Sequence, residues 1–321
     1  MKNTKQFTPR SFAIVGAGPV GCIVAAFLAN AGYEVTLCDV VPELISPAAD
    51  RGIILEGAEN LQAKVTRTCN SVEDLAEYDP DVIIIAVKSN LSSLLASSIA
   101  SFQREGMYVL SWQNGIDTEL EMVPDLGRKA VLRGVVNLGC GLKSPCHVTI
   151  PFHHAPHFIQ ALDPESVVAS IGIADAFSKA GLLTENTDNI VSLVWRKSIL
   201  NACMNPVCAL TGLTMAEAMG DPEVLNIVDQ LVKECVKVAR ANEIQLGWGF
   251  YPYAIEYMSK AGHHKPSMLV DIETRRRTEI NFINGQFVRY GKQAGIETPY
   301  NLMIMSLVKA LENKRRQELF S

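Results

Sequence analysis

The feature that most constrains this chain is a glycine-rich turn between two short apolar runs near its amino end. The run Phe12-Ala13-Ile14-Val15 predicts a buried strand, and Gly16-Ala17-Gly18-Pro19-Val20-Gly21 follows at once. An alanine-rich apolar stretch then predicts a helix, and Tyr33–Cys38 predicts a second strand that leads into Asp39. A strand, a tight turn, a helix and a second strand in this order predict a β-α-β unit within a parallel sheet.

Each glycine of the turn has its own role in binding a dinucleotide. Gly16 permits the tight turn, Gly18 lets the backbone approach a pyrophosphate, and Gly21 lets the helix pack closely on the strand. The N-terminus of the helix that follows attracts phosphate charge. Pro19 and Val20 of the same turn are also predicted to bind cofactor. The alternative is a glycine-rich turn of an α/β protein that binds nothing.

The acidic residue after the second strand bears on which dinucleotide is bound. A carboxylate at Asp39 can accept hydrogen bonds from the ribose hydroxyls of NAD and would repel the 2′-phosphate of NADP. No arginine follows directly, since Val40, Val41 and Pro42 come next. We therefore expect NAD(H) to be preferred over NADP(H). The alternative is an aspartate that only shapes a turn.

Two later strands place further polar residues at the same edge of the sheet. The strand expected over Asp81–Val87 ends at Lys88, and the one over Gly106–Ser111 leads to Gln113-Asn114-Gly115. Open α/β sheets bind ligands at the carboxyl ends of their strands. Lys88 is thus a candidate for contact with cofactor phosphate or ribose, and Asn114 for contact with nicotinamide or substrate. A surface lysine and an Asn-Gly turn are the alternatives.

A row of polar residues lies in the middle of the chain. Lys197, Asn201 and Asn205 recur at a spacing of four, which places them on one face of a helix. One cation and two amides suit an anionic substrate with hydroxyl and carbonyl groups. Pro206 disfavours the helical conformation at Asn205, so we expect the helix to kink or end there. The alternative is a solvated polar stripe.

A third set of candidates follows later in the chain. Ser267 is expected either to cap a helix or to bind a substrate carboxylate. On the helix expected over Ile272–Ala294, Glu279 would lie at the edge of an inward-facing apolar stripe. A partly buried glutamate needs a cation, for which Lys197 is a candidate. The alternative is a solvated acid that pairs with Arg275-Arg276.

The whole chain has the composition of an ordinary enzyme. Its 321 residues suffice for two domains, and its net charge of −5 argues against a general nucleic-acid binder. No apolar run reaches transmembrane length, and the first ten residues lack the apolar core of a secretory signal. The eight cysteines lack zinc or C-x-x-C spacing. We read them as reduced, mostly buried thiols of a cytoplasmic protein.

The pattern of elements changes about half-way along the chain. Strands alternate with helical stretches up to about Thr184, and no convincing strand follows Asn186. This predicts an α/β protein with an N-terminal Rossmann-type doubly wound domain over residues 1–186 and a C-terminal all-helical domain over 187–321, with the site in the cleft between them. The expected helices of the second part are Asn186–Ala209, Asp221–Asn242, Tyr251–Lys260, Ile272–Ala294 and Pro299–Leu319.

Seven motifs in order resemble those of one enzyme family over nearly the whole chain. They are Gly16-x-Gly18-x-x-Gly21, Val87-Lys88, Gln113-Asn114-Gly115, Trp195-x-Lys197-x-x-x-Asn201-x-x-x-Asn205-Pro206, Ser267-Met268-x-x-Asp271, Glu279-x-x-x-x-Asn284-Gly285 and Gly295-Ile296-x-Thr298-Pro299-x-Asn301. The chain resembles the 2-dehydropantoate 2-reductases, also called ketopantoate reductases.

The resemblance implies a role for each candidate. It implies that Lys197 is the catalytic acid, that Glu279 orients it, and that Lys88 contacts cofactor. It also implies that the substrate site is lined by Asn114, Asn201, Asn205 and Ser267. The implied reaction is hydride transfer from NAD(P)H to the carbonyl of a 2-oxo acid, with ketopantoate to pantoate as the default, and it needs no metal.

Three departures from the family pattern leave the substrate open. Val40 stands where members that prefer NADPH carry an arginine, and Met215 replaces a family asparagine. The histidines of Pro151–His157 could bind a metal or reach the substrate, but an exposed loop is expected there. The histidines concerned are His153, His154 and His157.

Two other functions therefore compete with the leading one. The first is a D-2-hydroxyacid dehydrogenase of the same fold that acts on a bulkier acid, which Met215 favours. The second is a non-catalytic NAD-sensing protein, which would need neither Lys197 nor Glu279. The expected partners are a small-molecule 2-oxo acid and, as an option, a second copy of the chain in a homodimer. No nucleic acid or membrane partner is expected.

Overall fold

The computed structural model describes residues 6–318 of the chain and divides into two compact units. Unit 1 comprises Met1–Gln113 and Asp117–Ile190, and unit 2 comprises Asn114–Ile116 and Val191–Ser321. The short Asn114–Ile116 segment thus packs with the helical second unit, although it lies far from that unit in sequence.

Unit 1 contains the strands and the first five α-helices. Its strands are β1 Ser11–Val15, β2 Glu34–Cys38, β3 Ile53–Gly57, β4 Leu61–Ala63, β5 Arg67–Cys69, β6 Val82–Ile85, β7 Tyr108–Ser111, β8 Val131–Val135, β9 Leu138–Ser144, β10 His147–His153, β11 His157–Ala161 and β12 Thr184–Asn186. Its helices are α1 Pro19–Asn30, α2 Pro42–Asp50, α3 Ser92–Ala100, α4 Val123–Leu126 and α5 Val167–Lys179, with the 3-10 helices η1 Glu73–Glu77, η2 Ser89–Leu91, η3 Leu120–Met122 and η4 Pro164–Ser166.

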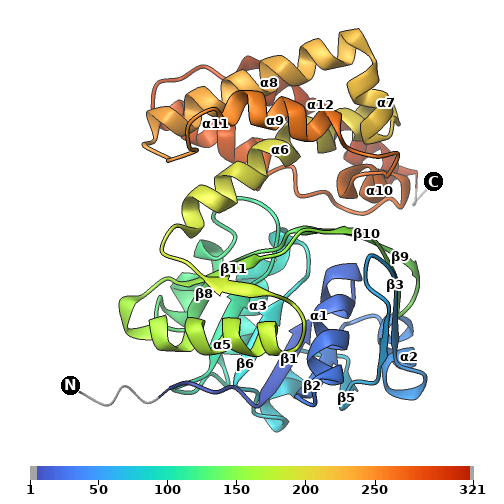
Figure 1. Cartoon of the computed structure of the whole chain (residues 1–321), viewed down its shortest axis with the longest axis vertical. Helices are drawn as coiled ribbons and strands as arrows, with labels where there is room; N and C mark the ends of the chain where they lie inside the picture. Colours follow the sequence, from blue (N-terminus) through green and yellow to red (C-terminus); the bar gives the residue numbers. More distant parts are fainter. Residues whose placement is uncertain (1–5, 319–321) are drawn as a thin grey trace. The chain divides into compact units, whose positions relative to one another are not determined.

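The central sheet of unit 1 has the doubly wound topology that the sequence predicts. Its eight strands lie in the order β12-β11-β8-β7-β6-β1-β2-β5, and neighbouring strands from β5 to β8 are parallel. The chain builds outward from β1 through β2 to β5, then returns to the other side of β1 at β6 (Figure 1). Val15 pairs with Cys38 on one side and Ile85 on the other. The β1/β6 boundary is therefore the switch point where such sheets bind ligands.

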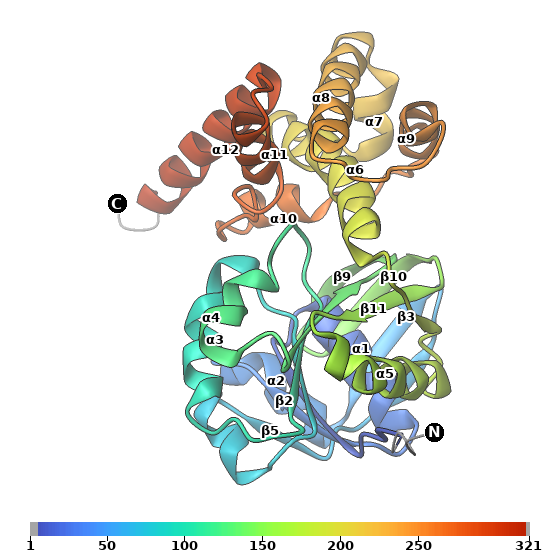
Figure 2. The same ribbon diagram turned by 90° about the vertical axis from the view of Figure 1, so that its left-hand side faces the viewer.

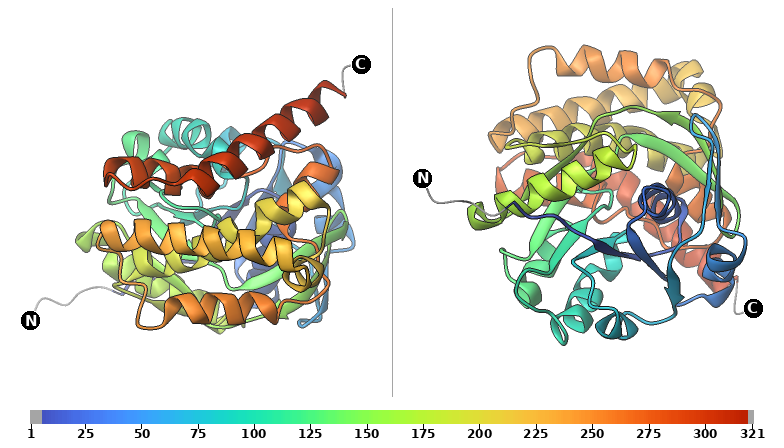
Figure 3. Two further views of the ribbon diagram at one scale, coloured as in Figure 1. Left: turned by 90° about the horizontal axis from the view of Figure 1, so that it is seen from above. Right: turned by 60° about the horizontal axis from the view of Figure 1, so that its bottom comes forward.

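A second, smaller sheet in unit 1 was not predicted. Its four strands lie in the order β4-β3-β10-β9, with β3 and β10 parallel. Helix α1 contacts strands of both sheets, and the view along α1 in Figure 3 (right) shows it between them. Residues Gly21–Leu28 of α1 are all buried. This double burial explains why α1 is apolar all round and not on one face alone.

Unit 2 consists of helices and the segments that join them, with no strand among its described residues. Its helices are α6 Ile190–Thr211, α7 Met215–Gly220, α8 Pro222–Ala241, α9 Phe250–Ser259, α10 Ser267–Glu273, α11 Asn284–Gln293 and α12 Pro299–Gln317, the first residue of α6 being the last of unit 1. Helix α8 contacts α7, α9, α11 and α12 (Figure 2). Trp195 of α6 packs edge-on against Phe287 and Tyr290 of α11, with ring centroids 5.5 and 5.0 Å away. No helix within residues 6–318 is long and apolar enough to span a membrane.

Helix α6 does not end at Asn205, so that part of the expectation is wrong. The helix continues through Pro206 to Thr211. Pro206 cannot donate to the carbonyl of Ala202, and the side chain of Asn284 donates to that carbonyl instead, at 2.9 Å. A tertiary contact thus replaces the missing helical bond.

The single helix expected over Ile272–Ala294 is also wrong, because the chain leaves the helical path after Glu273. Arg275 adopts a left-handed conformation with φ of 57°. Its N–H donates to the carbonyl of Ile272 at 3.2 Å, and the N–H of Arg276 donates to that of Asp271 at 2.8 Å. This pair of bonds is the Schellman motif that closes helix C-termini. The expected end of the last helix at Leu319 lies outside the described residues.

Candidate functional site

The turn after β1 needs glycine at its first position. Gly16 has φ of 110°, and its N–H donates to the carbonyl of Cys38 at 2.8 Å. A Cβ at this position would lie 2.8 Å from Cγ1 of Val87 and 3.0 Å from the carbonyl carbon of Ala86. The turn is therefore pressed against the chain that leaves β6, at the switch point of the sheet.

Of the next two glycines, Gly18 leaves open space beside the turn and Gly21 allows close packing. Gly18 is the N-cap of α1, and no atom lies within 4 Å of where its Cβ would stand. Pro19 and Val20 begin the helix, whose first turn carries no acidic residue. A Cβ on Gly21 would lie 1.9 Å from the carbonyl oxygen of Gly16. The loop thus leaves a free approach to a helix N-terminus, which suits a pyrophosphate.

The Asp39 carboxylate braces the glycine-rich turn. Its Oδ2 accepts a hydrogen bond from the N–H of Ala17 at 2.8 Å, and its Oδ1 accepts one from the N–H of Val41 at 3.0 Å. The turn-shaping alternative from the sequence therefore describes part of what this residue does. Each carboxylate oxygen keeps a second lone pair, so acceptance of ribose hydroxyls remains compatible with these bonds.

Gln113 is a structural link that sequence reasoning passed over. Its Nε2 donates to the carbonyl of Val87 at 2.9 Å, directly before Lys88. Its Oε1 accepts from the hydroxyls of Ser92 at 3.2 Å and Ser111 at 3.0 Å. The amide therefore fixes the end of β6, where Lys88 is half-buried. The feature of the sequence that could have pointed to Gln113 is its position in the Gln113-Asn114-Gly115 motif.

A buried ion pair lies behind Gln113. Arg133 is 2% exposed, and its Nη1 donates to the Ser111 hydroxyl at 3.1 Å. Its Nε lies 3.4 Å from Oε2 of Glu119. Burial raises the pKa of Glu119, and the charge of Arg133 opposes that rise. This cation orients the Ser111 hydroxyl toward Gln113, because the hydroxyl accepts from the arginine and donates to the amide.

The polar row of unit 2 lies on one helix, as its spacing predicts. Lys197, Asn201 and Asn205 all belong to α6. Asn205 is buried, and Lys197 and Asn201 are half-buried. Solvent access along the row therefore falls from Lys197 to Asn205.

Glu279 lies in a turn and not on a helix. It belongs to the segment between α10 and α11, and its backbone carbonyl accepts from the N–H groups of Phe282 at 2.9 Å and Ile283 at 3.1 Å. The residue is nevertheless only 7% exposed. Glu279 is therefore buried, as expected, but not because it lies beside the apolar face of a helix. The solvated alternative is wrong, and Arg276 lies instead 3.8 Å from Asp271.

The Asn114 segment is attached to the turn that carries Glu279. The N–H of Ile116 donates to the carbonyl of Phe282 at 2.9 Å, and Nε2 of Gln286 donates to the carbonyl of Ile116 at 3.2 Å. Gly115 has φ of 104°, and a Cβ there would lie 2.8 Å from both Cβ and O of Phe282. Asn114, half-buried, is thus held beside that turn by the chain on its C-terminal side.

Ser267 occupies the first position of α10 and is exposed. The N-cap of that helix is Pro266 and makes no side-chain capping bond. The capping alternative for Ser267 is therefore wrong, because the residue lies one position inside the helix.

The histidine segment is not the exposed loop that the sequence predicts. His153 ends β10, and His157 begins β11 and is 1% exposed. Nδ1 of His153 lies 2.7 Å from Oε1 of Glu59, and the two Nε2 atoms of His153 and His157 lie 3.2 Å apart. Only His154 of the three is exposed. Residues 6–318 hold no group of three or more His, Cys, Asp or Glu side chains that could bind a metal.

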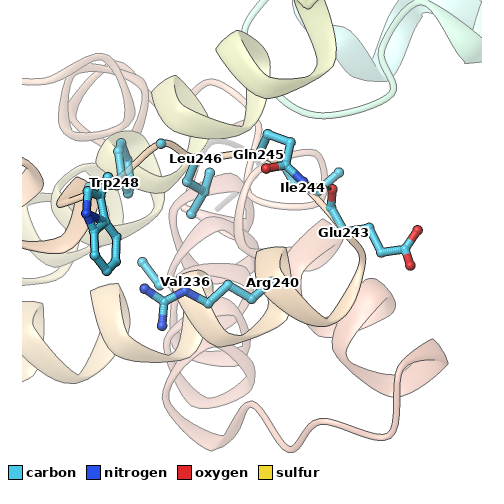
Figure 4. A pocket seen from close by; sticks show the side chains of 9 residues that line it. Val236, Arg240, Glu243, Ile244, Gln245, Leu246 and Trp248 are labelled. Atoms are coloured by element: carbon cyan, nitrogen blue, oxygen red, sulfur yellow. Dashed lines mark hydrogen bonds between the residues drawn. The ribbon is translucent and has the colours of Figure 1, made fainter.

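A hollow of about 490 Å³ lies on unit 2 away from these candidates. Figure 4 shows the segment Glu243–Trp248 passing along the α8 side chains of Val236 and Arg240. None of the predicted site residues lines it. This hollow therefore plays no part in the candidate site.

Comparison with known proteins decides the family. Residues 12–161 match the description "Ketopantoate reductase PanE/ApbA", and residues 189–312 match its "C terminal" counterpart. The chain belongs to the ketopantoate reductase family. The 2-dehydropantoate 2-reductase of Pyrococcus horikoshii is 32% identical to it over 301 residues, which cover 94% of this chain and 97% of the relative.

Solved structures of ketopantoate reductases and of a related dehydrogenase share this fold. A PanE/ApbA family ketopantoate reductase from Ralstonia eutropha JMP134 is 27% identical, with a TM-score of 0.84. A ternary complex of D-mandelate dehydrogenase with NADH and anilino(oxo)acetate is 28% identical, with a TM-score of 0.85. Each likeness covers 95% of this chain and 99% of the other. This ketopantoate reductase family member is therefore a nicotinamide-dependent oxidoreductase, which argues against the non-catalytic sensor.

Proposed function

We propose that this protein is an NADH-dependent 2-oxo acid reductase, with ketopantoate as its default substrate. The observation that carries the proposal is the row of Lys197, Asn201 and Asn205 on α6, in a unit that also buries Glu279. A solvated surface would not place an ammonium group and two amides at this depth. Membership of the ketopantoate reductase family supports the reaction class.

The cofactor is assigned to the glycine-rich turn. Gly16, Gly18 and Gly21, with Pro19 and Val20, would hold its pyrophosphate, since the Gly18 backbone is open to approach. Lys88 would contact phosphate or ribose, and Asn114 would contact nicotinamide or substrate. Asp39 would accept the ribose hydroxyls and disfavour a 2′-phosphate. Preference for NADH over NADPH follows from Asp39 and from the absence of an arginine at Val40.

The chemistry divides between cofactor and side chains. When bound, the nicotinamide supplies a hydride to the carbonyl carbon of the substrate. The Lys197 ammonium stabilises the negative charge that develops on the carbonyl oxygen and donates a proton to it from Nζ. Glu279 would hold that ammonium in place and favour its charged form, because a carboxylate close to an amine favours the protonated state.

The substrate is held by neutral polar groups. Asn201 and Asn205, with Asn114 and Ser267, would donate hydrogen bonds to the substrate carboxylate and bind a distal hydroxyl group. Amides both donate and accept, which suits a ligand with carboxylate, carbonyl and hydroxyl oxygens. The assignment needs no metal.

A second substrate class is favoured by one comparison. The D-mandelate dehydrogenase complex, with NADH and anilino(oxo)acetate, matches this chain as well as the ketopantoate reductase structure does. Met215, at the start of α7, replaces a polar family residue with an apolar one. The runner-up is therefore a D-2-hydroxyacid dehydrogenase of the same fold for an aromatic or branched 2-oxo acid.

A spectrophotometric screen of NADH oxidation tests the function. Ketopantoate, pyruvate, a branched 2-oxo acid and phenylglyoxylate would be compared at equal concentration, each with NADH and with NADPH. Turnover of ketopantoate supports the default. An inert ketopantoate beside a fast aromatic or branched acid would favour the runner-up, and no oxidation with any acid would overturn both.

The remaining assignments are also proposals. We assign cofactor binding to residues 1–186 and substrate chemistry to 187–321, with the Asn114 segment shared. A cytoplasmic location is consistent with eight cysteines that carry no disulfide. The homodimer remains an option because Leu302, Met303 and Leu307 of α12 are each about half exposed. Sedimentation velocity distinguishes a monomer from a dimer.

A further inference from the structure

Helix α6 contains a carbonyl that the helix itself cannot satisfy. In an α-helix each N–H donates to the carbonyl four residues earlier, so the partner of the Ala202 carbonyl would be the N–H of residue 206. Pro206 has no N–H. Ala202 is 0% exposed, so bulk water cannot replace the missing donor. A buried carbonyl without a donor is strongly destabilising.

Asn284 fills this position. Its Nδ2 donates to the Ala202 carbonyl at 2.9 Å and to Oδ1 of Asn301 at 3.0 Å. The Asn301 amide is itself oriented, because its Nδ2 donates to Oε2 of Glu234 at 2.8 Å. Asn284 and Asn301 are both 0% exposed. The chain of bonds leaves one consistent orientation for the Asn284 amide, with its nitrogen toward α6.

Asn284 follows the turn that begins at Glu279 and is the first residue of α11. The N–H of Ile283 donates to the carbonyl of Glu279 at 3.1 Å, and the N–H of Gly285 donates to that of Ile280 at 2.9 Å. Asn284 lies between these two donors. Its side chain therefore joins the Glu279 turn to α6 at Ala202, the residue after Asn201.

We propose that Asn284 is a positioning residue, which sets the Glu279 turn against the Lys197–Asn205 stretch of α6 through the bond that Pro206 leaves free. The proposal rests on the proposed function, in which Lys197 and Glu279 carry the chemistry. It gives Pro206 a role as well. Because proline has no N–H, the Ala202 carbonyl is left without a helical donor and can accept a hydrogen bond from a side chain in another part of the fold.

A double-mutant cycle tests the bond directly. Asn284→Ala removes the donor, and Pro206→Ala supplies a helical N–H in its place. Hydrogen exchange of the peptides over residues 198–210 would be measured in the full chain for the wild type, both single variants and the double variant. We expect Asn284→Ala to speed exchange in α6 about tenfold more with Pro206 present than with alanine there.

The matched control uses the other partner of the Asn284 amide. Asn301→Ala removes the acceptor at Oδ1 that orients the Asn284 amide but keeps the Asn284 donor itself. Its effect on exchange in α6 should therefore depend less on the residue at position 206 than the effect of Asn284→Ala does. Peptides of α1 in unit 1 should show no change in any variant.

Kinetics decide whether the bond positions catalytic groups. Asn284→Ala should lower kcat about tenfold with little change in the KM for NADH. Adding Pro206→Ala should restore the protection of α6 from exchange but not the lost kcat, because a helical N–H does not rejoin the Glu279 turn to α6. A purely structural role would leave kcat per folded enzyme unchanged.

Each unfavourable outcome has a definite meaning. Equal effects of Asn284→Ala on exchange in α6 in both backgrounds overturn the proposal. If Asn284→Ala does not fold, a double variant that also fails to fold overturns it. Coupling in exchange without any effect on kcat retains the bond but overturns the positioning role. A Lys197→Ala enzyme of normal kcat would overturn the proposed function instead, and the exchange cycle would still report on Asn284.

Discussion

Lys197 is half-buried on α6, one turn before Asn201. Its removal deletes the charge opposite the nascent alkoxide together with the proton donor. We expect Lys197→Ala to lower kcat by about 10²–10⁴ with NADH binding nearly unchanged, because the residue lies outside unit 1. The measurements are kcat and a cofactor-binding titration.

Two further variants serve as comparisons for the Lys197→Ala prediction. Glu279→Ala should lose less in kcat and should also raise the KM for the 2-oxo acid, because Lys197 is no longer held in place. Lys237→Ala, an exposed lysine of α8, should behave as the wild type. A Lys197→Ala enzyme that keeps more than about a tenth of the wild-type kcat would exclude the acid role.

Cofactor preference also belongs to single residues. Asp39→Ala should narrow the preference for NADH, which we expect to be about ten- to hundredfold in the wild type. The same change removes the bond from Ala17, so it should weaken both cofactors. The quantity to compare is thus the ratio of kcat/KM values for NADH and NADPH.

Val40→Arg separates these two effects. Val40 is 76% exposed, so an arginine fits there without disturbing the Asp39 bonds. It should raise kcat/KM with NADPH and leave that with NADH near the wild-type value. A wild type equally efficient with NADPH would contradict the assignment of Asp39.

At the scale of elements, the Asn114 segment depends on Gly115. Gly115→Ala would place a Cβ 2.8 Å from Phe282 at a φ of 104°. We expect a loss of about 2–4 kcal/mol in the free energy of unfolding, from backbone strain and overlap together, and a lower kcat because Asn114 moves. Urea unfolding and steady-state kinetics measure the two effects.

Gly212 of the same unit provides the control. It also has a positive φ, of 76°, but no atom lies within 4 Å of where its Cβ would stand. Gly212→Ala should therefore cost only about 1 kcal/mol and leave kcat unchanged. Equal losses for the two variants would mean that contact with Phe282 is unimportant.

At the scale of the whole molecule, a half-buried histidine links stability to pH. Burial lowers the pKa of His264 below its ordinary value of about 6.5. The unfolded chain then binds a proton at His264 more readily than the folded chain does. The contribution of neutral His264 to the free energy of unfolding is therefore complete above pH 6.5 and is lost as the pH falls through the pKa of His264 in the folded state. The thermal midpoint should therefore decline from pH 7 to pH 5.

His264→Gln removes that proton-binding difference and should flatten the decline. His263→Gln is the matched control, since His263 is its exposed neighbour. Thermal unfolding followed across this pH interval compares the three proteins. An unchanged slope in His264→Gln would show that other groups govern the acid limb.

Local signals were sufficient to predict the nucleotide-binding half. The residues expected for β1 and β2 agree with the observed strands to within one residue, and the helix between them ends at Asn30 as expected, although it begins inside the glycine motif. Gly16 and Gly21 were singled out for tight turning and close packing, and the structure shows both. These predictions succeed because the turn, the caps and the apolar runs are set by residues adjacent in sequence.

The sequence did not predict the second sheet, because its central pair of strands comes from segments far apart in the chain. β3 pairs with β10, nearly a hundred residues further along the chain. His153 and His157 are held by Glu59 and by each other, which no local pattern of histidines reveals. Cross-strand partners of this kind are visible only when the chain is folded.

By itself, the sequence determined the α/β class, the doubly wound topology, the helical second part and the shared face of Lys197, Asn201 and Asn205. Only the tertiary structure decided where two helices stop. Arg275 takes a left-handed position usually given to glycine, so α10 ends and Glu279 falls in a turn. Pro206 carries a local signal to stop α6, yet Asn284 satisfies the Ala202 carbonyl and the helix continues. In both places a hydrogen bond to a backbone carbonyl, and not the intrinsic preference of a residue, decides where the helix ends, because a buried carbonyl must find a donor in the fold.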